Sequence, residues 1–327
     1  MEHLNLAAFA QVLRKRETAR LYFEPARSGV LSWNTHADSG RIAFRLLRAR
    51  QPCGDWLDLA EWRPGGAKSF SPVHEGTRVN VDVIEATQPF DGIEVHARDV
   101  EFELVAFSSP VRARTSLPYG RDALILDVPA RSQYPSTPLR AGSSAPLRAS
   151  SSTPLRAGSS APLGASSPEE ERGWCSPASL SMIHAFHGIE SSVAETARAV
   201  FDRAYNGTGN WSFNVAYSGR LGLRGAVAHL RNLEHAARLI ERNLPLAISY
   251  SWRDGELPGA PLEHSDGHLA VLCGFTRDGD CAMNDPAAPN VRVVYPRGAI
   301  ERIWQRNEGV VYVVAPIGIE YADILSS

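Results

Sequence analysis

The sequence lacks the features that mark several broad classes of protein. Lysine and arginine number 34 against 36 aspartate and glutamate residues in a chain of 327, so the net charge is −2 and there is no basic excess of the kind that nucleic-acid binders carry. The longest apolar runs, such as residues 309–319, are too short to cross a bilayer. Residues 1–20 mix charged with apolar side chains and contain no signal-peptide core. We therefore expect no nucleic-acid partner, no membrane span and no export segment within this sequence.

Cysteine is scarce as well. The chain has only four: Cys53, Cys175, Cys273 and Cys281. They form no C-x-x-C pair, which argues against a disulfide-rich scaffold and a structural zinc site. Cys273 and Cys281 lie too near a predicted turn to face each other squarely, so free thiols are expected. His264 and Asp266 are close in sequence, but no further ligands follow at metal spacing, and neither a metal nor a cofactor is predicted.

What is present is the balance of a globular protein, with 43% hydrophobic and 21% charged residues. The length is typical of two domains. One segment, residues 135–171, departs from this composition, because it contains four copies of an eight-residue unit: STPLRAGS, SAPLRASS, STPLRAGS and SAPLGASS. Each unit offers one Leu and one Pro among small polar residues, too little apolar surface to offset the entropy lost on ordering. We predict a flexible loop. A partner-binding Pro-rich stretch is the alternative.

The chain before the repeat has the pattern of strands. Residues 79–83 and 93–104 alternate apolar with polar side chains, and turn-forming residues recur about every ten positions. This pattern predicts an all-β sandwich or jelly-roll domain over residues 1–115. A short amphipathic helix is expected ahead of it, over residues 4–13. No cluster of titratable groups in this half indicates catalysis.

The chain after the repeat has a different pattern. Apolar spacing and cap signals predict helices over residues 175–187, 192–201 and 232–242. Strands are predicted over residues 246–250, 268–275, 280–284, 291–295 and 310–314. Helices followed by an antiparallel set of strands indicate an α+β fold.

Cys175 is the first residue with a chemical signal. It lies in the segment GWCSPAS at residues 173–179, where Pro177 is tolerated only in the first turn of a helix. The sulfur then lies at a helix N-terminus, whose free N–H groups and dipole stabilise the nucleophilic thiolate. The alternative is a buried structural cysteine.

His268 and Asp285 are the next candidates. His268 begins an apolar strand, and the chain turns near Asp278 and returns to Asp285. A hairpin of this length brings Asp285 back to the level of His268, where its carboxylate can orient the imidazole as the third member of a triad does. The alternatives are a core or surface histidine, and an Asp285-Pro286 step that only starts a turn.

These motifs, WCSPAS at residues 174–179, GHL at 267–269 and NDP at 284–286, resemble in that order the C39-like cysteine peptidases of the papain-like superfamily. The resemblance covers roughly residues 125–316 and includes GTGNW at 207–211. It implies a papain-like domain over residues 116–327 in which the repeat, 135–171, is an inserted loop. The first half resembles the sandwich that precedes such domains in some bacterial proteins.

The resemblance also implies roles for individual residues. Cys175, His268 and Asp285 would form the triad, and Gln133, in the segment VPARSQ, would help to form the oxyanion hole. Many relatives have Gly directly after the nucleophile, where this chain has Ser176, so the amide there could face substrate differently. Two aromatic side chains could line the cleft and bind substrate, or simply pack: Trp174 and Trp211.

The function implied is a thiol peptidase that hydrolyses peptide or amide bonds in a peptide or protein substrate. Two alternatives stay open. The same triad could transfer the acyl group to an amine, as an acyltransferase or transamidase does, or the chain could be a non-catalytic protein whose sandwich binds a cell-surface polymer. Relatives often act outside the cytoplasm, and the sequence itself assigns no compartment.

Overall fold

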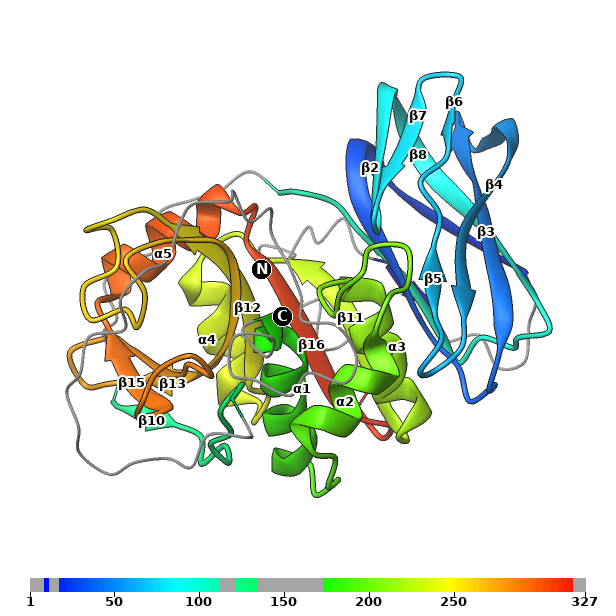
Figure 1. Cartoon of the computed structure of the whole chain (residues 1–327). Coiled ribbons are helices and arrows are strands. Elements are labelled where there is room, and N and C mark those ends of the chain that lie inside the picture. Colours follow the sequence, from blue (N-terminus) through cyan, green and yellow to red (C-terminus); the bar gives the residue numbers. More distant parts are fainter. Residues whose placement is uncertain (1–8, 12–17, 112–121, 135–172, 320–327) are drawn as a thin grey trace.

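The computed structural model describes residues 9–11, 18–111, 122–134 and 173–319, and these build two antiparallel sheets and five helices (Figure 1). The predicted α+β class is confirmed, as is the all-β character of the N-terminal part. The repeat expected to form a loop, residues 135–171, lies outside the described residues. Within the described helices, none is long and apolar enough to cross a membrane.

The N-terminal strands form one hydrogen-bonded sheet. Its strands are β1 (Phe9–Gln11), β2 (Thr18–Asn34), β3 (Gly40–Arg48), β4 (Gln51–Trp62), β5 (Lys68–Ser69), β6 (Val73–His74), β7 (Thr77–Asn80), β8 (Val83–Arg98) and β9 (Leu104–Ser108). The order is β1-β9-β2-β8-β3-β4-β5, and the β6–β7 hairpin joins through β8. Strand β2 shifts register on either side of Ala26, the kind of irregularity that bends a strand, and its last residues, from Val30 to Asn34, pair with β9. Strands of a sandwich can pass from one layer to the other at such bends.

The prediction of a helix over residues 4–13 is wrong for residues 9–11, the part of that segment that the structure describes. Phe9–Gln11 forms β1, which pairs antiparallel with β9. A helix of about ten residues is marginal in water even with a favourable pattern. The open edge of β9 offers the backbone an alternative set of hydrogen bonds, which decides in favour of the strand.

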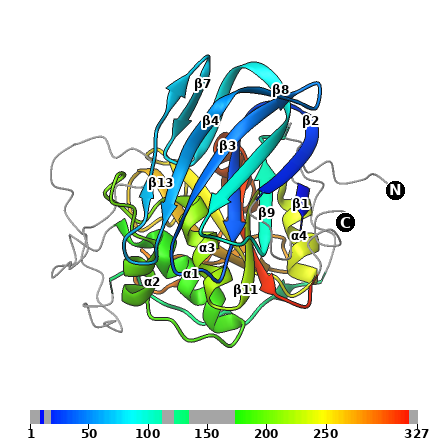
Figure 2. The ribbon, with the colours of Figure 1, turned by 90° about the vertical axis from the view of Figure 1, so that its right-hand side faces the viewer.

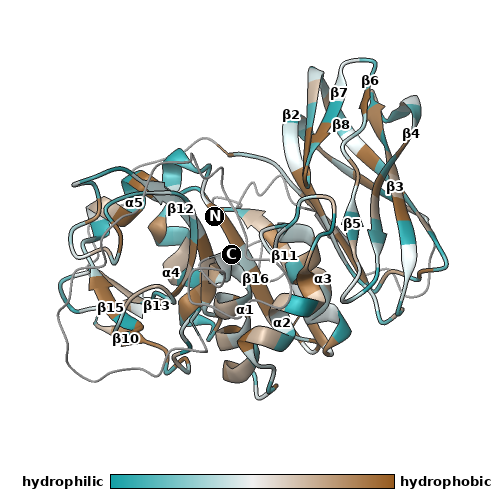
Figure 3. Cartoon of the chain, viewed as in Figure 1, coloured by the Kyte–Doolittle hydropathy of each residue, from teal (hydrophilic) through white to brown (hydrophobic). Residues whose placement is uncertain are grey.

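The second sheet belongs to the C-terminal part. Its strands are β10 (Leu124–Ile125), β11 (Leu223–His229), β12 (Leu246–Trp252), β13 (Ser265–Phe275), β14 (Cys281–Asn284), β15 (Arg292–Tyr295) and β16 (Val310–Pro316). The order is β11-β16-β12-β13-β14-β15, with β10 on β13. Gly274 is required there, because a Cβ at this position would lie 1.9 Å from the Leu124 carbonyl oxygen. The first six residues of β16 are all buried, and the strand is largely brown in Figure 3.

Five helices accompany this sheet. They are α1 (Cys175–Phe186), α2 (Val193–Val200), α3 (Trp211–Arg220), α4 (Leu233–Glu241) and α5 (Arg297–Arg306). The three predicted helices are confirmed as α1, α2 and α4, and each end falls within one residue of its prediction. Their boundaries were readable because cap signals are local: Ser192 and Glu195 form a capping box on α2, and Asn232 caps α4.

Helix α3 joins the two parts of the molecule. Its Phe213 and Ala216 pack in the core of the N-terminal sheet, whereas Val215 packs in the core of the second sheet. Asn34, at the end of β2, donates from Nδ2 to the carbonyls of Val215 and Gly225 and accepts from Gly225 N. Figure 2 shows the N-terminal sheet lying against α3 and β11. The predicted division at residue 115 falls among residues outside the described ranges, between β9 and β10.

Candidate active site

Cys175 is the first residue of α1, a helix whose residues from Cys175 to His184 are all buried. The first hydrogen bond in this turn runs from Ala178 N to the Trp174 carbonyl, so the amides of Cys175 and Ser176 lie ahead of it at the positive end of the helix. Ser176 is buried and its hydroxyl lies 2.9 Å from the Tyr312 hydroxyl, so its side chain points into the core.

A buried contact brings α1 to the strand that carries His268. Ser179 follows Cys175 by four residues and therefore shares its helix face. Its hydroxyl donates to the carbonyl of Leu269, at 3.1 Å, directly after His268. The imidazole of His268 is flanked on β12 by Tyr250 and Trp252, whose rings meet it edge to face with centroids 5.5 Å away. These contacts fix both the position and the tilt of the imidazole.

Asp285 lies where the predicted hairpin places it. The pairing of β13 with β14 sets Asn284 opposite Val271, and Asp285 follows. Its Oδ1 lies 2.8 Å from His268 Nε2 and also accepts from Ala287 N at 3.0 Å, while Oδ2 accepts from the Tyr295 hydroxyl at 2.8 Å. Asp285 is fully buried, so this hydrogen bonding offsets the cost of its charge.

The charges of the pair stabilise one another. Burial lowers the pKa of His268, but the charge and hydrogen bond of Asp285, together with Cys175, outweigh burial and raise that pKa to about 10. Burial raises the pKa of Asp285, yet His268 and Tyr295 bring it below its ordinary value. Since Nε2 faces Asp285, Nδ1 is the ring nitrogen left for an interaction with Cys175. The Asp285 carboxylate favours the imidazolium form of His268.

A sequence profile of the peptidase C39 like family matches residues 125–312, more than half of the chain. The chain belongs to the C39-like peptidase family. Among solved structures it is similar to a C39-like peptidase from Bacillus anthracis, with 14% identity and a TM-score of 0.40, covering 60% of this chain and 98% of the other. A comparison with curated proteins found no match.

In this C39-like chain, Gln133 lies buried beside the turn that follows Asp285. Its backbone N–H donates to the Pro286 carbonyl at 2.9 Å, and the Ser132 hydroxyl donates to the same oxygen at 3.4 Å. The backbone of this segment is therefore attached to the turn that directly follows Asp285. The role expected of the Gln133 side chain stays a prediction.

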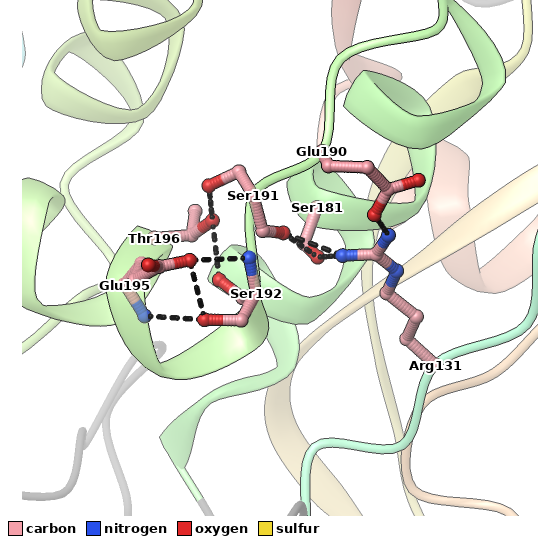
Figure 4. A network of polar contacts seen from close by, with 7 residues as sticks. All are labelled: Arg131, Ser181, Glu190, Ser191, Ser192, Glu195 and Thr196. Atoms are coloured by element: carbon pink, nitrogen blue, oxygen red, sulfur yellow. Dashed lines mark hydrogen bonds and ion pairs between the residues drawn. The ribbon is translucent and has the colours of Figure 1, made fainter.

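Arg131 connects the Gln133 segment to α1, the helix that begins with Cys175 (Figure 4). Its Nη1 donates to the Ser181 hydroxyl at 2.8 Å and to the Ser191 carbonyl at 2.5 Å, and Nη2 pairs with Glu190 at 2.6 Å. The Arg131 side chain is 20% exposed, whereas that of Glu190 is 84% exposed. The hydrogen bonds of Arg131 with Ser181 and Ser191 are therefore better shielded from water than its ion pair with Glu190.

The two tryptophans have different surroundings. Trp174 is buried and packs with Ala178, Val193 and Ala197 between α1 and α2, which is a packing environment. Trp211 is half-buried at the start of α3 and packs against the larger core. The surroundings of the two side chains show packing, and the role in substrate binding stays a prediction.

Sequence reasoning did not single out Ser179, Tyr295 or Arg131 as supports of the site. A signal existed for Ser179, since it lies one helical turn from Cys175. Tyr295 and Arg131 reach their partners only through tertiary contacts. Among the described residues, no three His, Cys, Asp or Glu side chains gather as a metal-binding group.

Proposed function

We propose that the chain is a thiol peptidase that hydrolyses peptide or amide bonds through Cys175, His268 and Asp285. The observation that carries the proposal is the buried His268–Asp285 pair held against the N-terminus of the helix that begins with Cys175. A nucleophile, a base and a group that orients the base are the three parts required for acyl transfer. The family to which the chain belongs supports the same reading.

The reaction begins with Cys175 as thiolate and His268 as imidazolium. The sulfur attacks the scissile carbonyl, the C–S bond forms, and the electron pair moves onto the carbonyl oxygen. The Cys175 backbone N–H and the Gln133 side chain stabilise this oxyanion. As the C–N bond breaks, the imidazolium gives its proton to the leaving amine. Neutral His268 then takes a proton from water, whose oxygen attacks the thioester and releases the acid and the thiolate.

A selective labelling experiment tests the nucleophile. With iodoacetamide near pH 6, we expect mass spectrometry to find the label on Cys175 and not on Cys273 or Cys281. These two thiols are fully buried, and burial raises the pKa of Cys273 to about 12 and that of Cys281 even further, whereas Cys175 retains 8% exposure. A Cys53→Ser background removes the label of that half-buried thiol.

The same preparation tests the reaction itself. Incubation with a peptide mixture should yield cleaved products, and an added amine should divert only a minor share of the acyl group. The peptidase assignment is contradicted if Cys273 or Cys281 is labelled as fast as Cys175. It is also contradicted if the protein is labelled at Cys175 but cleaves no peptide. Products that consist mainly of the amine adduct assign acyl transfer to the same triad.

Arg131 offers a separate prediction about the oxyanion hole. Arg131→Met should lower kcat roughly tenfold, because it removes the bonds that fix the Gln133 segment against α1. Alkylation of Cys175 needs no oxyanion hole, so its rate should change little. The matched control is Glu190→Gln, which alters only the exposed side of the network and should retain activity. A fall in hydrolysis and alkylation by the same factor contradicts this role.

A further inference from the structure

The N-terminal part places a carboxylate at the start of α3. Asp82 lies in the turn between β7 and β8, where Val81 has a φ of 62°. It is 5% exposed, and its Oδ2 accepts from Trp211 N at 2.6 Å and from Ser212 N at 3.1 Å. An anion there satisfies amides that have no partner within the helix and complements the helix dipole.

A second carboxylate completes this cap. Asn210 Oδ1 accepts from the next amide, Phe213 N, at 3.1 Å. The Asn210 side chain is oriented by its Nδ2, which donates to Asp202 Oδ2 at 3.0 Å. Asp202 is fully buried and accepts from Ser69 N of β5 through Oδ1, also at 3.0 Å. The first amides of α3 are therefore bound by Asp82 and by Asn210. Asp82 belongs to the N-terminal part, and Asn210 is held by Asp202, which itself binds strand β5.

The start of α3 is connected in turn to the nucleophile. Asn214, in the first turn, donates from Nδ2 to the Thr208 carbonyl at 2.8 Å. The Thr208 hydroxyl donates to the Gly173 carbonyl at 3.1 Å, two residues before Cys175. Thr208 is fully buried and Gly173 is half-buried, so this bond is partly shielded from water. Hydrogen bonds joined by the backbone of α3 thus connect the β7–β8 turn with the N-terminus of α1.

We propose that Asp82 is a positioning residue for the nucleophile, so that the N-terminal sheet is a working part of the peptidase and not only a separate binding module. Resting on the proposed function, this assigns the sheet the task of holding the approach to Cys175 through α3 and Thr208. Asp82 touches neither the substrate nor the reacting atoms. Its effect is on the precision with which the sulfur and the α1 amides are placed.

The surroundings of Asp82 make its charge state relevant to the experiment. Burial raises the pKa of Asp82 to about 7, against the lowering effect of the Ser212 and Trp211 amides, and the nearby charge of Asp202 raises it further. Tyr205 and Tyr312 also lie near Asp82, and burial raises the pKa of both above the ordinary value. Measurements at pH 8 therefore study Asp82 mainly in its ionised form.

The test compares Asp82→Ala with a control on the same helix. Asp38→Asn alters a carboxylate of the N-terminal part that pairs with Arg220 at the other end of α3, at 2.6 Å, and it is 86% exposed. Asp82→Ala should lower kcat about tenfold to a hundredfold at pH 8 with little change in KM, since misplaced reacting groups reduce turnover. Asp38→Asn should retain activity. Asp82→Asn, which keeps an acceptor oxygen, should recover part of the loss.

Thr208→Val supplies a second route if Asp82→Ala fails to fold. It removes only the hydroxyl that holds the Gly173 carbonyl, and it should lower kcat in the same direction. Combined with Asp82→Asn, its effect should be less than additive, because both act through one series of contacts. The proposal is overturned if the effects of Thr208→Val and Asp82→Asn on kcat are fully additive. It is also overturned if Asp82→Ala lowers Tm but leaves both kcat and Cys175 alkylation unchanged.

Hydrogen exchange separates this proposal from the peptidase assignment. Peptides that cover the start of α1 should exchange faster in Asp82→Ala than in wild type or Asp38→Asn, whether or not the protein cleaves peptides. Unaltered exchange there overturns the positioning role even if wild type proves to be an active peptidase. If wild type cleaves nothing but Asp82→Ala still exchanges faster than wild type at the start of α1, the structural connection is supported and only the assigned reaction is contradicted.

Discussion

Replacing Cys175 with alanine is expected to abolish peptide hydrolysis, with a loss of roughly a hundred-thousandfold or more. The physical reason is that no covalent intermediate can form without the sulfur, and no other thiol lies at the start of α1. The folded structure should survive, because Ala fits a first-turn helix position and the substitution removes only the sulfur atom. Initial rates with a cleaved peptide, together with thermal unfolding, measure both expectations.

The controls for Cys175→Ala come from the same chain. Cys273→Ala and Cys281→Ala remove buried thiols at β13 and β14 and should leave the catalytic rate close to wild type, although each opens a small cavity. Hydrolysis that persists in Cys175→Ala, or that is lost equally in Cys273→Ala, would exclude Cys175 as the nucleophile. Iodoacetamide labelling of the three variants identifies which thiol reacts.

Asp285→Asn is expected to lower kcat/KM roughly a thousandfold. The amide preserves the shape of the side chain but removes the charge that holds the pKa of His268 at about 10. Burial then dominates and brings that pKa below its ordinary value, so the imidazole is neutral and Cys175 loses its charged partner. The rate of Cys175 alkylation should consequently rise only at higher pH than in wild type.

The stability of Asp285→Asn should change with pH in a defined direction. Between pH 6.5 and about 10, wild-type His268 holds a proton that the unfolded chain has released, so its contribution to stability is complete below 6.5 and is lost towards pH 10. Wild type should therefore have a larger free energy of unfolding than Asp285→Asn. This difference should be largest near pH 6.5 and should shrink as the pH rises towards 10.

Two further variants make the Asp285 result specific. Asp278→Asn alters an exposed carboxylate in the turn of the same hairpin and should match wild type in rate and in pH dependence. Tyr295→Phe removes the hydroxyl that donates to Asp285 Oδ2 and should cause a loss smaller than that of Asp285→Asn. A pH profile of alkylation that is the same in Asp285→Asn and wild type would contradict the triad.

Much of the C-terminal fold could be predicted because its signals are local. The limits of α2 and α4 follow from capping side chains, and the approach of Asp285 to His268 follows from hairpin length. Helix α3 was not predicted, because it is buried between two cores and therefore shows no single apolar face. The long strand β2 was missed for a related reason, since its register changes along its length and its pattern does not alternate regularly.

The sequence by itself determined the class of fold, the family motifs and which residues could form a triad, because caps, turns and alternation act over a few positions. Only the tertiary structure decided how the two parts are joined. Asn34, Asp82 and Arg131 each act on residues about 50 to 190 positions away, and no local pattern records such partners. Buried polar groups must find hydrogen bonds wherever the fold brings acceptors or donors, so those pairings exist only once the chain has folded.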